Sequence, residues 1–252
     1  MKLADKVAVV TGGGTGMGRA TCLLFAQEGA KVLVNYAHSQ HEAEAVASEI
    51  NASGGTALAY QADVTSQAQA KQMMDAVASR WGRLDVLVNN AGWSTRVPHD
   101  RLDDLTDEIW DRTLNTNLRG PFYCVRAAVP LLRRQTGASI VNIASVAAFH
   151  ASGSSMAYAA AKAGLVTLTR SLARVLAPDI RVNVLCPGFV KTRFAGWPEE
   201  AFEKAREVTP LRRLATVEDV AKGVLFLAAD AEALTGEAIV IDGGVFQLGR
   251  SR

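Results

Sequence analysis

The sequence of 252 residues lacks several features that mark special classes of protein. It has three cysteines, Cys22, Cys124 and Cys186, whose odd number and wide spacing match neither a disulfide framework nor a zinc motif. We therefore expect reduced, mostly buried thiols in a cytoplasmic protein, and no metal site. No apolar run is long enough to span a bilayer or to form a signal core, so no membrane partner is expected.

The chain also lacks an excess of charge of either sign. Lys and Arg together number 27 against 25 for Asp and Glu, which gives a formal net charge of +2. This balance provides no electrostatic reason to expect nucleic acid as a partner. The composition, 49% hydrophobic and 21% charged, excludes a disordered chain and is typical of a globular protein.

Short β-branched runs alternate with amphipathic stretches along the whole chain. Seven strands are predicted, at residues 7–11, 31–36, 56–61, 84–89, 139–144, 180–185 and 238–242. Most are continuously apolar, as expected for strands that are covered on both faces. Helical crossovers without any linker predict one α/β domain over residues 1–252, built on a doubly wound parallel sheet with helices on both faces.

Two irregular regions, residues 92–106 and 188–216, interrupt this rhythm. Long loops in a compact α/β domain usually build or cover a site. In such sheets ligands bind beyond the carboxyl ends of the strands, where both regions emerge. We therefore expect residues 188–216 to cover the substrate.

The first strand leads directly into a glycine-rich turn, Thr11-Gly12-Gly13-Gly14-Thr15-Gly16-Met17-Gly18, which a helical pattern follows. Glycine allows the backbone to turn tightly and to approach a pyrophosphate, and the next helix N-terminus supplies free N–H donors. A purely structural turn remains the alternative. The position after the first strand of an α/β series favours dinucleotide binding.

The end of the second strand bears on which dinucleotide is bound. An acid there would accept a hydrogen bond from the ribose 2′-hydroxyl of NAD and repel the extra phosphate of NADP. The sequence instead has Tyr36, Ala37, His38 and Ser39, of which His38 and Ser39 could donate to a phosphate. We favour NADP over NAD, although neither Thr15 nor Ala37 is the Arg or Lys that would secure this choice.

Tyr158 and Lys162 lie four residues apart at the start of a predicted helix, so they share one face. A free tyrosine has a pKa near 10, too high for a ready proton relay at neutral pH. A neighbouring ammonium is expected to lower it. Ser145, at the end of the fifth strand, is well placed to complete the arrangement with a hydroxyl near a substrate carbonyl.

These pieces together resemble the short-chain dehydrogenase/reductase family, in its compact single-domain branch, over nearly the whole chain. The matching elements, in order, are Thr11-Gly12-x-x-x-Gly16-x-Gly18, Asn89-Asn90-Ala91-Gly92, Asn117, Ser145, Tyr158-x-x-x-Lys162 and Pro187-Gly188-x-x-x-Thr192. The end of the second strand is similar to that of the family's NADPH-dependent naphthol reductases. The family's fold is the Rossmann-like arrangement predicted above.

The resemblance implies a role for each matching residue. Tyr158 would be the general acid in carbonyl reduction and the base in alcohol oxidation. Lys162 would lower its pKa and hold the nicotinamide ribose, Ser145 would orient the substrate oxygen, and Asn117 would hold a water that passes the proton to solvent. The implied cofactor contacts are Gly12, Thr15, Gly16, Met17, Gly18, Tyr36, His38, Ser39, Asp63, Val64, Asn90, Gly92, Tyr158, Lys162, Val190 and Thr192.

Three functions remain open at this point. The first is an NADP-dependent oxidoreductase that acts on a small ketone or secondary alcohol. The second is a 3-oxoacyl-carrier-protein reductase, and the third is a catalytically silent nucleotide-binding sensor or scaffold. An apolar substrate is favoured by aromatic and other large residues in the expected pocket segments, namely Trp93, Phe149, His150, Met156, Phe189, Phe194 and Trp197.

Two predicted helices have strongly apolar faces. One carries Leu118, Phe122, Val125, Val129 and Leu132, with an early kink expected at Pro121, and the other covers residues 165–176. These faces look too apolar for water on every side. Members of the family that this sequence resembles pair such helices between subunits, so the resemblance implies a homotetramer.

Overall fold

The computed structural model describes residues 1–249 and contains one seven-stranded sheet in the order β3-β2-β1-β4-β5-β6-β7, with every neighbouring pair parallel. The strands are β1 (Val7–Val10), β2 (Lys31–Tyr36), β3 (Thr56–Gln61), β4 (Val86–Asn89), β5 (Ala138–Ile143), β6 (Ile180–Pro187) and β7 (Ala238–Ile241). The strand order reverses between β1 and β4, so the fold class and all seven predicted strands are confirmed. The predicted boundaries differ by no more than two residues.

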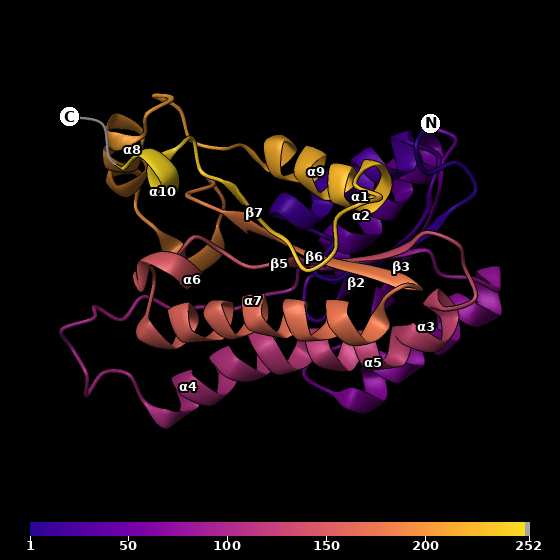
Figure 1. Cartoon of the computed structure of the whole chain (residues 1–252), viewed down its shortest axis with the longest axis horizontal. Helices are drawn as coiled ribbons and strands as arrows, with labels where there is room; N and C mark the ends of the chain where they lie inside the picture. The colour runs from indigo at the N-terminus through magenta and orange to yellow at the C-terminus, as the bar shows by residue number, and fades with distance from the viewer. Residues whose placement is uncertain (250–252) are drawn as a thin grey trace.

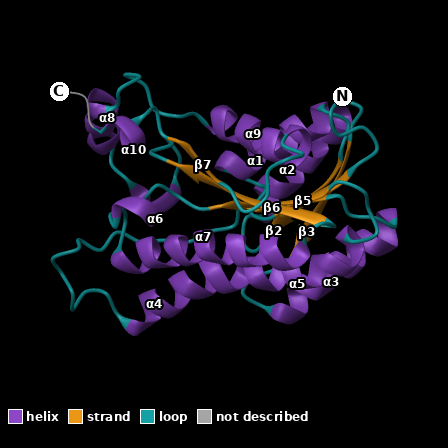
Figure 2. Cartoon of the chain, viewed as in Figure 1, coloured by secondary structure: helices purple, strands orange, loops and turns teal. Residues whose placement is uncertain are grey.

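Helices cover both faces of the sheet (Figures 1 and 2). The helical elements are α1 (Gly16–Gln27), α2 (Gln40–Ala52), α3 (Gln67–Trp81), α4 (Asp107–Leu114), η1 (Asn115–Arg119), α5 (Gly120–Leu132), α6 (Ala147–His150), α7 (Met156–Leu176), η2 (Phe194–Gly196), α8 (Glu199–Val208), α9 (Val217–Leu225), η3 (Phe226–Asp230) and α10 (Val245–Leu248). One core joins the sheet to α1, α2 and α9, and a second joins its other face to α3, α5 and α7. Within residues 1–249, no helix is both long enough and apolar enough to cross a membrane.

The structure corrects two predictions about local shape. Residues 188–216 contain a regular helix, α8, whose buried Phe202 faces the fold. The irregularity expected at Pro121 lies just before it, in the π-turn η1, and Pro121 occupies the first turn of α5. Because Arg119 and Gly120 are helical, Pro121 lies within a continuous helical segment that runs from α4 through η1 into α5.

The two apolar helix faces point mostly into the subunit itself. Val125 and Leu132 on α5, and Leu165, Leu172 and Leu176 on α7, are all buried. Large apolar side chains that stay exposed on these helices include Phe122, at 37%, and Val175, at 66%. Most of the apolar side chains on these two helices are therefore covered within the subunit, and the homotetramer stays a prediction.

A buried carboxylate ties the start of β1 to the start of β4. Asp85 is 2% exposed and accepts hydrogen bonds from the Val7 backbone N–H at 2.9 Å and from Arg83 at 2.7 Å, and Lys6 lies 3.3 Å away. Burial acts to raise the pKa of Asp85. The Arg83 and Val7 hydrogen bonds and the Lys6 charge together outweigh this effect, so the pKa lies below its ordinary value.

Asp85→Asn is therefore expected to lower the free energy of unfolding by about 1–3 kcal/mol at pH 7. Because the pKa is lower in the folded than in the unfolded state, this stabilisation is present above the unfolded-state pKa and disappears as the pH falls through the folded-state pKa. Urea unfolding of both proteins at pH 7 and at several acidic pH values measures this difference. A difference in the free energy of unfolding that stays constant down to the lowest pH would contradict the lowered pKa of Asp85.

Candidate active site

The glycine-rich turn between β1 and α1 packs so closely that side chains are excluded from it. A Cβ on Gly18 would lie 2.2 Å from the Gly12 carbonyl oxygen, and one on Gly14 would lie 3.0 Å from the Ala43 backbone N. Gly12 has φ of +63° and Gly16 has φ of +53°, a region that favours glycine. The turn therefore presents bare backbone at the carboxyl end of the sheet.

Two asparagines hold this turn against the neighbouring strands. Asn90, just after β4, donates from Nδ2 to the Thr11 and Gly12 carbonyls at 2.9 and 3.1 Å. Asn35, in β2, accepts from the Gly12 backbone N–H at 3.3 Å and donates to the Ala62 carbonyl at 2.9 Å. Asn90 was predicted as a site residue, whereas the contribution of Asn35 was missed because its partners are distant in sequence.

The N-terminus of α1 fits the phosphate group of a dinucleotide. Thr15 stands at the N-cap without a side-chain capping bond, and the first turn carries no acid. The first N–H groups of α1 therefore have neither a partner inside the helix nor the Thr15 side chain as a cap, and the helix dipole adds a partial positive charge. Gly16, Met17 and Gly18 open the helix as predicted, so these residues would hold the pyrophosphate of a dinucleotide.

A tyrosine, a serine and a lysine converge where β5 meets α7. Ser155 caps α7 by accepting from the Tyr158 backbone N–H at 3.2 Å, which fixes the start of the helix. Ser145, which follows β5, lies near enough to Tyr158 for its hydroxyl to act against the rise in the pKa of the phenol. The Lys162 Nζ donates to the Ile143 carbonyl at 2.8 Å and lies 5.6 Å from the centre of the Tyr158 ring. The predicted juxtaposition of these three side chains is present.

The pKa values of the pair are governed by burial. Desolvation raises the pKa of Tyr158, and the Ser145 hydroxyl only partly opposes this effect. Desolvation lowers the pKa of Lys162 to about 8, because the side chain is only 4% exposed. The expectation that Lys162 leaves the Tyr158 phenol more acidic than a free tyrosine was wrong for the protein groups alone. The arrangement favours a phenol that holds its proton.

Asn117 lies on the π-turn η1, where the helix from α4 to α5 changes its hydrogen-bond spacing. Its Nδ2 donates to the Trp93 carbonyl at 2.6 Å and to the Thr113 carbonyl at 2.9 Å. The Oδ1 atom is buried without a hydrogen-bond partner and lies 3.0 Å from the point where a Cβ on Gly92 would stand. A π-turn inside an α-helix is frequent at functional sites, and here it brings a polar side chain against the 92–106 loop.

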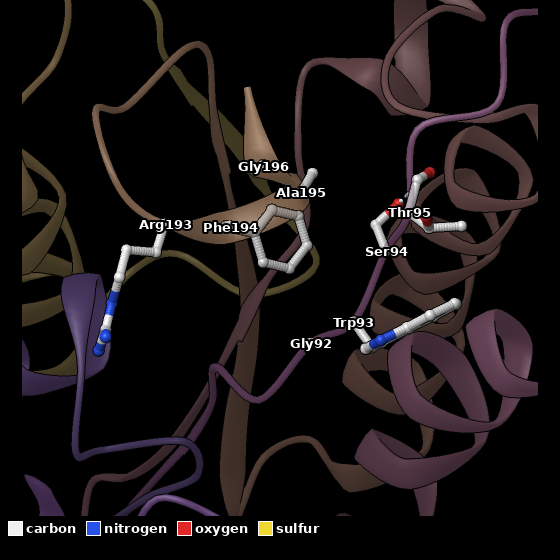
Figure 3. Close-up of a pocket in the computed structure, with 8 residues that line it drawn as sticks. All are labelled: Gly92, Trp93, Ser94, Thr95, Arg193, Phe194, Ala195 and Gly196. Carbon is white, nitrogen blue, oxygen red and sulfur yellow. Dashed lines mark hydrogen bonds between the residues drawn. The ribbon is translucent and has the colours of Figure 1, made fainter. Parts of the chain in front are cut away.

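Residues 188–216 are called the covering segment below. A cavity of about 470 Å³ opens between this segment and the 92–106 loop. Its lining residues are Gly92, Trp93, Ser94, Thr95, Arg193, Phe194, Ala195 and Gly196. Figure 3 shows the Phe194 ring between the two loops, with Trp93 and Thr95 on one side and Arg193 extending away on the other. Phe194 also lies 5.7 Å from the Tyr158 ring, so this cavity adjoins the tyrosine. Its volume suits a small-molecule site.

Several predicted pocket residues lie elsewhere. Phe149 and His150 pack against Phe246, at 4.9 and 5.5 Å between ring centres. Phe189 packs against Trp197 and Phe202 within the covering segment. Of the predicted aromatic set, Trp93 and Phe194 line the cavity. Met156, at 37% exposed, instead lines a smaller pocket beside Val97 and Leu105.

The remaining predicted cofactor residues lie at the carboxyl ends of their strands. Tyr36 ends β2 and is 8% exposed, His38 is exposed, and Ser39 stands at the N-cap of α2 without a side-chain capping bond. Asp63 and Val64 follow β3; the Asp63 carboxylate accepts from Thr65, and Val64 is 6% exposed beside α5. Val190 pairs with Ala215 and closes the base of the covering segment, and the Thr192 methyl lies 3.5 Å from where a Cβ on Gly16 would be. In the range 1–249, no group of three His, Cys, Asp or Glu side chains is arranged to hold a metal.

Fold and site together indicate a dinucleotide-dependent oxidoreductase, because a glycine turn suited to phosphates and a tyrosine–lysine pair lie at the same end of the sheet as this cavity. Residues 12–246 match the family described as enoyl-(acyl carrier protein) reductase. The chain is 39% identical over 249 residues to the 3-oxoacyl-[acyl-carrier-protein] reductase FabG of Thermotoga maritima, which covers 97% of this chain and 99% of the relative. It is 40% identical over 245 residues to the FabG of Staphylococcus aureus strain Mu50, covering 96% and 98%.

The solved structures agree with this assignment. A provisionally assigned short-chain dehydrogenase/reductase from Burkholderia xenovorans has a TM-score of 0.90 and 38% identity over 96% of this chain and 98% of that one. A dehydrogenase/reductase from Sinorhizobium meliloti 1021 has a TM-score of 0.89 and 34% identity, covering 96% and 95%. The chain belongs to the short-chain dehydrogenase/reductase family and is an oxidoreductase that transfers hydride between a nicotinamide cofactor and a ketone or secondary alcohol.

Proposed function

We propose that this protein uses NADPH to reduce the ketone of a 3-oxoacyl thioester to the 3-hydroxyacyl product. The observation that carries the proposal is the junction of Ser145, Tyr158 and Lys162 beside the cavity at the end of β5. The identity to two FabG proteins over nearly their full length supports this substrate class among ketones. A simple apolar ketone or secondary alcohol is the broader alternative.

Tyr158 is the proposed general acid. When bound, the reduced nicotinamide supplies a hydride to the carbonyl carbon, and the carbonyl oxygen takes a proton. The Tyr158 phenol holds this proton at neutral pH because burial raises its pKa, and the Ser145 hydroxyl orients the oxygen. Lys162 has a pKa of about 8, so it is protonated in most molecules at pH 7. Its ammonium group would contact the nicotinamide ribose and stabilise the Tyr158 phenolate that forms.

Proton resupply is the role proposed for Asn117. Its buried Oδ1 lacks a partner, and a buried amide oxygen without a hydrogen bond is a place where a bound water is expected. Such a water would return a proton from solvent toward Lys162 and Tyr158. This role complements the packing that Asn117 already provides through its bonds to Trp93 and Thr113.

The cofactor contacts are part of the same proposal. The glycine turn would hold the pyrophosphate, and Tyr36, His38 and Ser39 would face the adenosine ribose and its 2′-phosphate. Asp63 and Val64 would flank the adenine. Asn90 and Gly92 would form the floor, and Val190 and Thr192 would meet the carboxamide end.

Nucleotide oxidation against a substrate panel tests this function. The panel should contain a 3-oxoacyl thioester on coenzyme A, the same acyl group on an acyl carrier protein, the matching enoyl thioester, an aromatic diketone and an aldose lactone, each with NADPH and NADH. We expect the highest kcat/KM for a 3-oxoacyl thioester with NADPH. Preference for the enoyl thioester or for the lactone would contradict the proposed substrate. Activity only with NADH would contradict the proposed cofactor.

We also propose a homotetramer of single-domain subunits, each spanning residues 1–252, in a reducing compartment such as the cytoplasm. Cys22, Cys124 and Cys186 are free and buried, which fits such a compartment. On α5, Phe122 is 37% exposed beside Tyr123 and under the Arg126 guanidinium, a combination that is frequent in protein interfaces.

Phe122→Glu is expected to shift the assembly toward smaller species, because a charge would have to be buried in the proposed contact. Multi-angle light scattering at micromolar concentration measures the mass of both proteins. Val175→Glu, on α7, is the comparison that shows whether α5 or α7 carries the contact. A wild-type monomer would exclude the tetramer.

A further inference from the structure

The covering segment places a basic side chain on the N-terminal part of the fold. Arg193 is 81% exposed at its side chain, and its Nη2 lies 3.5 Å from the Glu42 carboxylate in the first turn of α2. Its neighbour Thr192 contacts the position of Gly16 at the start of α1. In Figure 3 the Arg193 side chain extends away from the cavity toward the indigo, N-terminal part of the chain. Arg193 thus bridges the covering segment and α2.

The Arg193 guanidinium lies where the adenosine end of a dinucleotide is expected. Glu42 is three residues beyond Ser39, the N-cap of α2, and the next residue, Ala43, packs against Gly14. In a fold of this kind the ribose 2′ position faces the residues that follow the second strand. The junction of the glycine turn with α2 is therefore the neighbourhood of a 2′-phosphate.

This neighbourhood is short of other basic groups that could bind a phosphate. Residues 36–41 contain neither Lys nor Arg. Arg19 on α1 is paired with Glu49 at 2.6 Å. The contact of Arg193 with Glu42 is longer, and both partners reach solvent, so it is a weak pair that a doubly charged phosphate can replace.

We propose that Arg193 exchanges Glu42 for the adenosine 2′-phosphate of NADP and thereby selects this cofactor over NAD. The inference rests on the NADP dependence proposed above. A guanidinium binds a phosphate through two parallel N–H donors, which neither His38 nor Ser39 can provide. The exchange leaves the Glu42 carboxylate beside the phosphate without its cation, so Glu42 opposes the binding that Arg193 favours.

Equilibrium binding of two nucleotide fragments tests the proposal without relying on turnover. Adenosine 2′,5′-bisphosphate carries the 2′-phosphate and AMP lacks it, and calorimetry on the full chain gives both dissociation constants. In Arg193→Ala we expect binding of the bisphosphate to weaken about ten- to a hundredfold, as for one lost charged hydrogen-bonding group, with AMP unchanged. Arg206→Ala, which removes another exposed arginine of the covering segment that pairs with Glu203, is the matched control and should leave both constants unchanged.

Glu42→Gln gives a change of opposite sign. It removes the competing carboxylate and a like charge near the phosphate, so binding of the bisphosphate should become two- to fivefold tighter. Weaker binding in this variant would contradict the exchange. An equal loss for AMP and the bisphosphate in Arg193→Ala, or no loss for either, would overturn the assignment of Arg193.

The wild-type protein separates this inference from the proposed function. If it binds the bisphosphate no better than AMP, the proposed NADP dependence fails. If it prefers the bisphosphate and Arg193→Ala retains this preference, NADP dependence stands and only the role of Arg193 is wrong.

Discussion

Replacing Tyr158 with phenylalanine is expected to lower kcat by about 10²–10⁴-fold, the range for loss of a positioned general acid. The substitution removes one hydroxyl and keeps the ring, so the contact with Phe194 and the fold of α7 should persist. Ser145 and Lys162 remain, but neither is placed to donate a proton to the substrate oxygen as the Tyr158 phenol is. Steady-state kinetics and cofactor titration by nucleotide fluorescence measure the two effects separately.

Cofactor affinity should change by less than about threefold in Tyr158→Phe, since the cradle for the phosphates lies on α1. Tyr123→Phe, on α5, is the matched control and should retain full kcat. Undiminished kcat in Tyr158→Phe would refute the assignment of the acid. An equal fall in kcat and in cofactor binding would instead indicate that the ring had moved.

Replacing Gly18 with alanine is expected to abolish measurable cofactor binding and to lower the free energy of unfolding by about 1–3 kcal/mol, as overpacking does. A Cβ at this position would lie 2.2 Å from the Gly12 carbonyl oxygen and 2.6 Å from Asn90 Nδ2. Backbone cannot rotate away as a side chain does, so the turn itself must shift. Because its N–H groups would hold the phosphates, a displaced turn loses binding even where the chain remains folded.

Gly164→Ala on α7 is the matched control for this glycine substitution. Its Cβ would lie 3.1 Å from the Leu118 side chain, which can change rotamer at little cost. Circular dichroism, urea unfolding and cofactor titration should show a folded, binding-competent protein. Cofactor binding within threefold of wild type in Gly18→Ala would show that the turn is not the phosphate site.

The sheet could be predicted because its determinants are local. A strand buried on both faces needs a continuous apolar run, and β1, β4, β5 and β6 are buried along most of their lengths. Helical periodicity, in contrast, tells which residues share a face but not what covers that face. Val125 and Leu165, which the periodicity places on apolar helix faces, are both buried within core clusters of the subunit.

In the candidate site, too, residues with a local sequence signal could be predicted and residues with distant partners could not. Tyr158 and Lys162 are one helical turn apart, and the glycine turn is continuous in sequence, so spacing alone could locate both. Arg193 and Asn35 depend on partners more than twenty residues away and carry no local signal. The direction of the Tyr158 pKa shift also depends on burial, which only the folded structure defines.

Thr192, Arg193 and Phe194 are consecutive, yet they face α1, α2 and Tyr158 respectively. A one-residue insertion or deletion in this tripeptide would put all three contacts out of register together. Attempts to redesign substrate choice by transplanting this stretch from a relative are therefore expected to alter nucleotide affinity in the same step. Single substitutions at Phe194 offer the cleaner route to a new substrate range.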